Sequence, residues 1–119
     1  MAKIDYFTRK LDDKNRLTIP VELREEFGSG VVVTKGFGDY LHLYPQKIWE
    51  EKIEPELEGG LLDERIADLS VRFRTGKTEA ELEPRQGRVT LKQTQLDFAH
   101  IQKDVEAVRA GSYFRLMAR

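Results

Sequence analysis

The feature that most constrains how this chain can fold is an internal repeat of 72 to 73 residues. Two pairs of segments match in the same order: KNRLTI at 14–19 with QGRVTL at 86–91, and GDYLHLY at 38–44 with GSYFRLM at 111–117. Arg16 thereby aligns with Arg88, and Gly38 aligns with Gly111. A repeat indicates two copies of one supersecondary unit, and each copy is too small to bury a core alone. We therefore expect the two halves to share one hydrophobic core.

Both halves predict the same order of elements. In each, short runs of β-branched and apolar residues predict strands, and the last two strands flank glycine in a predicted hairpin. The predicted strands are 5–11, 16–19, 31–35, 40–44, 77–83, 88–91, 105–109 and 113–117. One short helix is predicted per half, the first beginning with Pro20 and ending at the glycines 28 and 30, the second covering 94–100 with Thr94 as N-cap.

The segment between the halves predicts a pair of helices. Pro45–Leu57 and Asp63–Phe73 each place apolar residues on one face, at the spacing of an amphipathic helix. These residues are Ile48, Trp49, Ile53 and Leu57 in the first helix, and Leu62, Ile66, Leu69 and Phe73 around the second. Pro55, Gly59 and Gly60 are expected to separate the two helices.

These patterns predict an α+β fold that is mainly β. Two repeats, 1–45 and 77–119, are expected to interleave their strands into one compact barrel with pseudo-twofold symmetry, and the helical pair of 46–76 connects them. The symmetry would bring the turns before Arg16 and Arg88 to equivalent places on the barrel.

The charges are balanced overall but unevenly distributed. The chain has 20 basic and 21 acidic residues, of which seven and seven fall in 1–45, two and seven in 46–64, and eleven and seven in 65–119. Basic patches are therefore expected locally rather than over the whole molecule. With no cysteine, disulfides and thiolate metal sites are excluded, and with no long apolar run a cytoplasmic protein without a membrane partner is expected.

The polar turn in LDDKNRLTIP, residues 11–20, gathers two acids, a lysine, an asparagine and an arginine before a short apolar run. Charged residues at a bend are usually only solvated, and Asp12 or Asp13 with Lys14 is then an ordinary turn with a weak surface ion pair. Recurrence of an arginine at the same place in the second half, in Gln86-Gly87-Arg88, favours a functional role instead.

Other chemistry has weaker support in the sequence. His42 alternates with Leu41 and Leu43 and is predicted to face solvent from a strand, and His100 is predicted to contact a helix C-terminus. We therefore expect no metal site and no cofactor.

Other polar and aromatic residues are predicted to serve the fold rather than an active site. The glutamates between 50 and 58 suit the wet side of a helix rather than a buried acid pair, and Gly36-Phe37-Gly38 predicts a turn rather than a nucleotide-binding loop. The remaining aromatic candidates, predicted as core or subunit contacts, are Trp49, Tyr40, Tyr44 and Phe114.

The residues of both turns resemble those of a known family. LDDKNRLTIPVELREEFGSGVVVTKGFGDYLHLYPQKIWEE is similar to the first half of the MraZ family of bacterial transcriptional regulators, and ELEPRQGRVTL with KDVEAVRAGSYFRLM resembles the second half. Each half of that family is marked by an Asp-x-x-x-Arg turn, usually with glycine before the arginine. Here the corresponding residues are Asp12 to Arg16 and Pro84 to Arg88.

The resemblance implies a fold of two AbrB-type swapped-hairpin modules in one chain and ring-shaped homo-oligomers. It also implies binding to direct repeats in the promoter of the division and cell-wall gene cluster, with the turns touching DNA. Three positions depart from the family pattern: Asn15 replaces glycine, Pro84 replaces the second acid, and Lys92 stands where the first half has Pro20. Asparagine tolerates a left-handed backbone, whereas proline removes a donor, so the second turn is expected to be shaped differently unless Glu83 compensates.

A DNA-reading turn would use these residue types for definite reasons. A guanidinium offers a planar fork of donors that suits phosphate and guanine edges, and a carboxylate across the turn would orient it. Lysines contribute less directional phosphate contacts. The candidate DNA-binding residues are Asp12, Lys14, Asn15, Arg16, Arg85, Gln86, Arg88 and Lys92.

The function expected is that of a non-enzymatic, sequence-specific regulator of transcription. It would bind double-stranded promoter DNA as a homo-oligomer in the cytoplasm, associated with the nucleoid, without a small-molecule substrate. An alternative is an oligomeric scaffold or protein-interaction module that has lost DNA reading, which the acidic centre and the altered second turn support. An enzyme is the least supported alternative, because the only supply of clustered titratable groups is the acidic helix.

Overall fold

The strands of the two halves pair with each other. The computed structural model describes residues 4–28, 30–60, 62–83 and 85–119. Its strands are β1 (Tyr6–Lys10), β2 (Arg16–Thr18), β3 (Gly30–Lys35), β4 (Leu41–Pro45), β5 (Thr78–Glu81), β6 (Arg88–Thr90), β7 (Asp104–Arg109) and β8 (Phe114–Ala118). All pairs are antiparallel, and they form a six-stranded sheet in the order β1-β7-β8-β4-β3-β5 and a two-stranded ribbon of β2 and β6.

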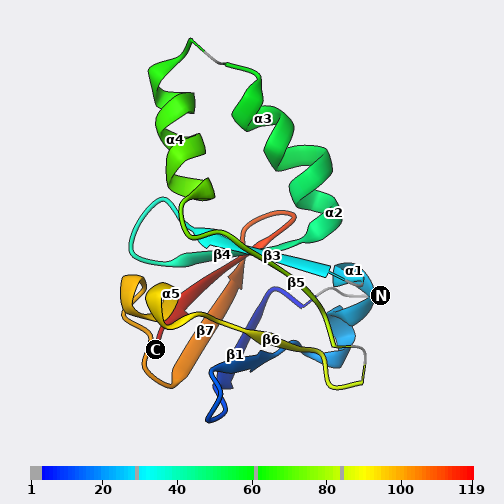
Figure 1. Ribbon diagram of the computed structural model, residues 1–119. Coiled ribbons are helices and arrows are strands. Elements are labelled where there is room, and N and C mark those ends of the chain that lie inside the picture. Colours follow the sequence, from blue (N-terminus) through cyan, green and yellow to red (C-terminus); the bar gives the residue numbers. More distant parts are fainter. Residues whose placement is uncertain (1–3, 29, 61, 84) are drawn as a thin grey trace.

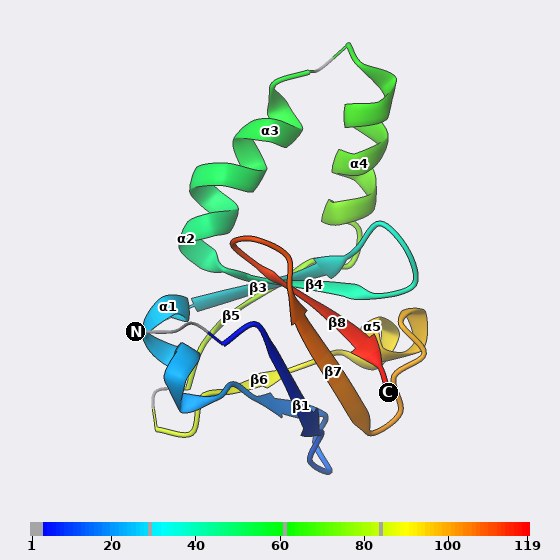
Figure 2. The same cartoon turned by 180° about the vertical axis from the view of Figure 1, so that it is seen from behind.

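The strand order is symmetric between the two halves. Exchanging β1 with β5, β3 with β7 and β4 with β8 reverses the order of the sheet without changing its neighbours, and the same exchange maps the ribbon onto itself. The central pair β4 and β8 joins the two halves, and each half's first strand lies beside the other half's hairpin (Figures 1 and 2). The mixed, mainly β class predicted from the repeat is confirmed.

The predicted single barrel is not closed. Within the described residues, β1 and β5 each pair along one edge only, and β2 and β6 pair only with each other. The two strands of the ribbon are each three residues long. The sheet is therefore open, and the ribbon lies against it as a second layer.

Hydrophobic cores fill both faces of the central strands. Leu41 and Leu43 of β4 join the large cluster that lies between the sheet, the ribbon and the short helices. Tyr44 faces the opposite side and joins a second cluster with Trp49 and Phe73 of the helical pair. His42 also faces that side and is 0% exposed, so the prediction that it faces solvent is wrong. Burial follows because helices cover the sheet face that an ordinary half-buried strand would expose to water.

The helical pair between the halves is confirmed. The first helix runs without a break through α2 (Gln46–Ile48), the π-helical turn η2 (Trp49–Ile53) and α3 (Glu54–Glu58), and α4 (Glu64–Arg74) returns beside it (Figure 1). Pro55 does not end the first helix as expected but lies in the first turn of α3. The π-helical turn before it provides the local widening that commonly accompanies a disturbed ladder of backbone hydrogen bonds.

Short helices close each half. The first half has η1 (Val21–Leu23), whose N-cap is Pro20, followed by α1 (Arg24–Phe27). Pro20 is therefore not the predicted first helical residue but the residue before it. The second half has α5 (Gln93–Phe98), whose N-cap is Lys92 rather than the predicted Thr94, because the Gln95 side chain accepts from the Lys92 amide at 3.0 Å. In the described part of the chain, no helix is long and apolar enough to span a membrane.

Both short helices end at backbone of positive φ. Gly28 has a φ of 67° after α1, and His100, 72 residues later, has a φ of 57° after α5. The His100 amide donates to the carbonyl of Asp97 at 3.2 Å, which confirms its predicted place at a helix C-terminus.

Candidate functional site

Arg16 and Arg88 lie on one face of the β2–β6 ribbon. Leu17 pairs with Val89 at the centre of the ribbon, and both side chains are buried in the large core. Alternation along the strands then places Arg16, Thr18, Arg88 and Thr90 on the opposite face. Arg16 pairs with Thr90 and Arg88 pairs with Thr18, so the two arginines are diagonal neighbours on that face.

Asp12 holds the first arginine in place. Its carboxylate accepts from the backbone amides of Lys14 and Arg16, each at 2.9 Å, and from Nε of Arg16 at 2.7 Å. The hydrogen bond from the Arg16 amide has the largest effect on the pKa of Asp12, and desolvation, second in size, opposes it. With the further hydrogen bonds from the Arg16 guanidinium and the Lys14 amide, the pKa is lowered to about 2. The carboxylate is therefore charged at neutral pH and fixes one edge of the Arg16 guanidinium, as the sequence predicts.

The same carboxylate also faces the second arginine. Nη1 of Arg88 lies 3.9 Å from Oδ2 of Asp12, and the side chains of Arg16 and Arg88 are 28% and 29% exposed. Nε of Arg88 is buried without a hydrogen-bond partner among the described residues. The two guanidinium groups thus both approach Oδ2 of one acid and have outer nitrogens without a protein hydrogen bond in the described part of the chain.

The two turns have the same backbone conformation before the arginine. Asn15 has a φ of 58° and Gly87 a φ of 61°, both in the left-handed region that asparagine and glycine tolerate best. The carbonyl of Asn15 accepts from the Leu91 amide at 2.9 Å, and that of Gly87 accepts from the Ile19 amide at 2.8 Å. Each turn is therefore tied to the strand of the other half.

Glu83 braces the second turn. Its carboxylate accepts from the amides of Arg85 at 3.1 Å and Gln86 at 2.9 Å, and its carbonyl accepts from the Gly87 amide at 2.7 Å. Asp12 occupies the corresponding place four residues before its arginine, whereas Glu83 precedes Arg88 by five. The expected effect of Pro84 lies outside the described residues, but an acid does cap this turn.

The other predicted residues surround the two arginines at the surface. Lys14, Arg85 and Gln86 are exposed in the two turns, and Lys92 is exposed where β6 leads into α5. Asn15 is half-buried, and its side-chain amide donates to Oε1 of Gln93 at 3.4 Å. The turns themselves lie at opposite ends of the antiparallel ribbon, so the arginines approach each other although the exposed turn residues do not.

Two further arginines beside the ribbon are not predicted by the sequence. Nε of Arg9, on β1, donates to the carbonyl of Thr18 at 3.1 Å. Arg24, on α1, donates to the carbonyls of Ile19, Arg85 and Gln86. Neither residue lies in the polar turns, and only the tertiary fold brings them to the ribbon, so no local sequence signal identifies them.

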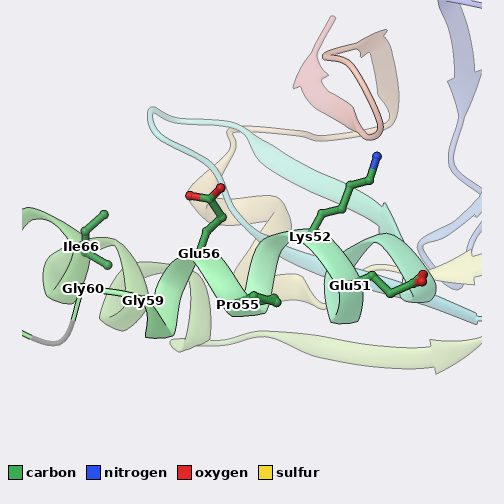
Figure 3. Close-up of a pocket in the computed structure, with 7 residues that line it drawn as sticks. All are labelled: Glu51, Lys52, Pro55, Glu56, Gly59, Gly60 and Ile66. Carbon is green, nitrogen blue, oxygen red and sulfur yellow. The ribbon is translucent and has the colours of Figure 1, made fainter.

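The helical pair offers a hollow of different character. It has a volume of about 710 Å³ and is lined by Glu51, Lys52, Pro55, Glu56, Gly59, Gly60 and Ile66 (Figure 3). The carboxylates of Glu51 and Glu56 project away from each other rather than converging on a common point. Among the described residues, no group of three histidine, cysteine or carboxylate side chains is placed to hold a metal ion.

The ribbon face and the acidic helices lie at opposite ends of the molecule. Figures 1 and 2 both place α3 and the start of α4 farthest from β1, β2 and β6. A ligand at Arg16 and Arg88 therefore meets clustered guanidinium groups without approaching the glutamates of the first helix. Such a face can bind phosphates or planar pairs of acceptor atoms.

Comparison with known proteins relates the chain to one family. Residues 6–61 match a family model described as "MraZ protein, putative antitoxin-like". The chain is 37% identical over 110 residues to the transcriptional regulator MraZ of Moorella thermoacetica, covering 92% of this chain and 76% of the relative. It is 31% identical over 117 residues to that of Clostridium tetani, with 98% and 81% covered, and 35% identical over 114 residues to that of Desulforamulus reducens, with 95% and 79% covered.

Proposed function

This chain belongs to the MraZ family, and from that premise we propose that it is a sequence-specific DNA-binding regulator of transcription. It would bind direct repeats in the promoter of the division and cell-wall gene cluster as a ring-shaped homo-oligomer, associated with the nucleoid. It would need no cofactor and catalyse no reaction. The observation that supports this proposal most directly is the placing of Arg16 and Arg88 on one ribbon face around the Asp12 carboxylate.

The arginines would act as the readers of the DNA. Asp12 engages Nε of Arg16, so the Nη1 and Nη2 atoms project as a fork whose orientation is fixed. A fork of this kind donates two hydrogen bonds to O6 and N7 of guanine, or to two phosphate oxygens. Arg88 has nearly the same exposure and lies 3.9 Å from the same acid, so we assign it the same task.

The remaining candidate residues would position the protein on the backbone. Lys14, Arg85 and Lys92 are exposed cations around the ribbon, which suits phosphate contacts that carry little sequence information. Asn15 and Gln86 would contribute neutral hydrogen bonds from the two turns.

Assembly into an oligomer would compensate for the small size of each site. One ribbon face is only a few residues wide, so a single subunit would bind DNA weakly. Several subunits on successive repeats would raise the apparent affinity through effective concentration. The exposed apolar residues Leu62 and Val71 of the helical pair are the contacts we propose between subunits. We also propose that 1–45 and 77–119 are swapped-hairpin modules joined by 46–76.

Substitution of the arginines tests the proposed function. Arg16→Ala and Arg88→Ala should each weaken specific promoter binding by about 1–3 kcal/mol if the arginine reads a guanine. Arg65→Ala is the matched control, because Arg65 is a 91% exposed arginine at the start of α4, far from the ribbon. Binding would be followed by gel-shift titration over a range of salt concentrations.

The outcome would also separate this function from the alternative of an oligomeric scaffold. A DNA reader loses affinity steeply as salt is added, because counterions are released from the phosphates. An assembled protein that shows no salt-sensitive DNA binding would favour the scaffold, for which the exposed apolar residues of the helical pair are the supporting observation.

A further inference from the structure

The guanidinium of Arg24 is committed to the second turn of the ribbon. Arg24 belongs to α1 in the first half, yet Nη1 donates to the carbonyl of Arg85 at 3.1 Å and Nη2 to that of Gln86 at 3.0 Å. Nε donates to the carbonyl of Ile19 at 3.2 Å. No ion pair joins Arg24 to an acid among the described residues, and each of its three side-chain nitrogens donates to a main-chain carbonyl.

Gly87 lies directly beneath this guanidinium. A Cβ at Gly87 would lie against Nε of Arg24 and 3.0 Å from its Cζ, closer than side-chain carbons normally approach. The Gly87 carbonyl also accepts from the Ile19 amide, so Arg24 bridges the end of β2 and the turn that leads into β6. The residue that follows Gly87 is Arg88.

Among the described residues, no arginine bridges the first turn in this way, and the turn's side-chain contact with α5 is a single hydrogen bond from Asn15 to Oε1 of Gln93, at 3.4 Å. Seventy-two residues after Arg24 the chain has Leu96, which is 1% exposed in the large core. The first turn is instead fixed by Asp12, which hydrogen-bonds both the backbone and the side chain of Arg16. No acid makes a hydrogen bond to the Arg88 guanidinium in the described part of the chain. The two turns are therefore held by different means, and Arg88 depends on its backbone for its position.

We propose that Arg24 is a positioning residue for DNA recognition, which fixes the second turn so that Arg88 is presented at a constant place relative to Arg16. This inference rests on the proposed function and adds to it a residue outside both turns. Arg24 itself need not touch DNA, because Nε, Nη1 and Nη2 each donate a hydrogen bond to a carbonyl group of the protein. A lysine at this position would keep the charge but lose the fork that reaches three carbonyls at once.

The test compares Arg24→Lys with the native protein in three backgrounds: native, Arg16→Ala and Arg88→Ala. Loss of two or more charge-assisted hydrogen bonds should lower specific promoter affinity about tenfold in the native background. The salt dependence should stay unchanged, since no charge is removed. In the Arg16→Ala background, Arg24→Lys should still lower promoter affinity about tenfold. In the Arg88→Ala background it should lower affinity only about twofold or less, because the effects of substituting residues that act as a unit are not additive.

A second variant keeps the test decisive if Arg24→Lys folds poorly. Gly87→Ala should displace the guanidinium and reproduce the loss of affinity. Gly111→Ala is its control, because Gly111 also has a positive φ, of 79°, but a Cβ there would meet no atom within 4 Å. Thermal unfolding of each variant would show how much of its effect is loss of folded protein.

Each outcome has a definite meaning. If the native protein binds promoter DNA and Arg16→Ala weakens it, but Arg24→Lys binds normally or loses affinity equally in both arginine backgrounds, the positioning role is wrong and the proposed function stands. If the native protein shows no salt-sensitive DNA binding, the proposed function fails and this inference fails with it.

Discussion

At the scale of single residues, Asp12 connects the two arginines of the ribbon. Its carboxylate accepts two backbone amides and Nε of Arg16, and lies 3.9 Å from Nη1 of Arg88. An acid in this place opposes DNA electrostatically, since it adds negative charge beside phosphates. Its benefit must therefore be the orientation of the guanidinium groups, which affects specific binding more than non-specific binding.

Replacement of Asp12 separates these two effects. Asp12→Asn keeps an acceptor for the backbone amides but removes the charge that hydrogen-bonds the Arg16 guanidinium and faces that of Arg88. We expect the ratio of specific to non-specific DNA affinity to fall several-fold, because charge-assisted hydrogen bonds orient the fork. Competition titrations with promoter and random DNA would measure it. Asp13→Asn, which removes the same charge from an exposed neighbour, should strengthen both affinities alike and leave the ratio unchanged.

The orientation of Arg16 should persist at acidic pH. The pKa of Asp12 is lowered from 3.8 to about 2, chiefly by the Arg16 amide. Its stabilising contribution is then complete above a pH of about 4, the ordinary value of an aspartate, and is lost only as the pH falls through about 2. Changes in DNA binding near neutral pH would need another cause.

His42 should make folding stability depend on pH. Burial, followed by the charges of Arg115 and Arg72, lowers the pKa of His42 to about 4. The unfolded chain therefore binds the extra proton first, and the free energy of unfolding should decrease by up to roughly 3 kcal/mol as the pH falls from 6.5 to 4. Chemical unfolding over this range would measure the slope, and nuclear magnetic resonance would give the titration midpoint.

Two variants identify the group responsible for that slope. His42→Phe should flatten it, because no imidazole remains to be protonated. Tyr44→Phe removes the hydroxyl that lies 2.8 Å from Nδ1 of His42 but keeps the imidazole, so most of the slope should remain. An equally steep slope in His42→Phe would contradict the assignment.

At the scale of elements, the helical pair covers the second hydrophobic cluster, which contains Tyr44, Trp49 and Phe73. Phe73 of α4 is 4% exposed, and its ring lies 5.4 Å from the rings of both Phe37 and His42. Arg72 beside it donates to the carbonyls of Gly36 and Gly38, so the hairpin between β3 and β4 is held to the same helix. The helices therefore fold onto the sheet through a few residues near their bases, and their far ends project away from it (Figure 1).

Truncation at the base of α4 should release this contact. Phe73→Ala should lower the free energy of unfolding by about 3–5 kcal/mol, the usual effect of removing a buried aromatic ring. Asp68→Ala, at an exposed position of the same helix outside the proposed subunit contacts, should change it by less than about 0.5 kcal/mol. Fluorescence of the single tryptophan, Trp49, would report local loosening, because its ring is fully buried against Tyr44.

The sequence predicts the elements better than their environments. The repeat, the amphipathic spacing and the turn residues are local, so they identify the strands and the helical pair. The family's glycine at the position of Asn15 also indicates the left-handed backbone found there. The solvent-facing prediction for His42 fails because alternation in a strand cannot reveal what covers its second face. The prediction of Thr94 as the N-cap of α5 is wrong because Gln95, three residues after Lys92, accepts the Lys92 amide and makes Lys92 the N-cap.

In the candidate site too, the contacts between residues close in the chain are predicted, and those between the two halves are not. The pairing of Asp12 with Arg16 lies within five residues of chain and is predicted from the sequence, and the structure has it at 2.7 Å. The approach of Arg88 to the same acid, and the attachment of Arg24 to the second turn, join residues from different halves. Such contacts depend on the register of the β2–β6 ribbon, which no local pattern reports.

At the scale of the whole molecule, the helical pair projects from one end of the symmetric sheet and the β2–β6 ribbon lies at the other, so the two ends of the molecule differ. The extents are 42 × 32 × 23 Å, with the ribbon and the projecting helices far apart (Figure 2). Subunits that associated through their helices would leave the ribbon faces free, each with two arginines. The proposed assembly is therefore compatible with DNA contacts by several subunits at the same time.

Such an assembly predicts that the number and spacing of DNA repeats control affinity. A fragment with two promoter repeats should bind the oligomer about 10²–10⁴ times more tightly than a fragment with one, because the second contact is intramolecular. Adding about 5 base pairs between the repeats should cancel most of this gain, since it moves the second site to the other side of the duplex. Gel-shift titrations of the three fragments would give the ratios, and native mass measurement would give the subunit number. A monomeric particle, or equal affinity for one and two repeats, would contradict the proposed assembly. The DNA contacts of Arg16 and Arg88 in a single subunit would still be tested by substituting those two arginines.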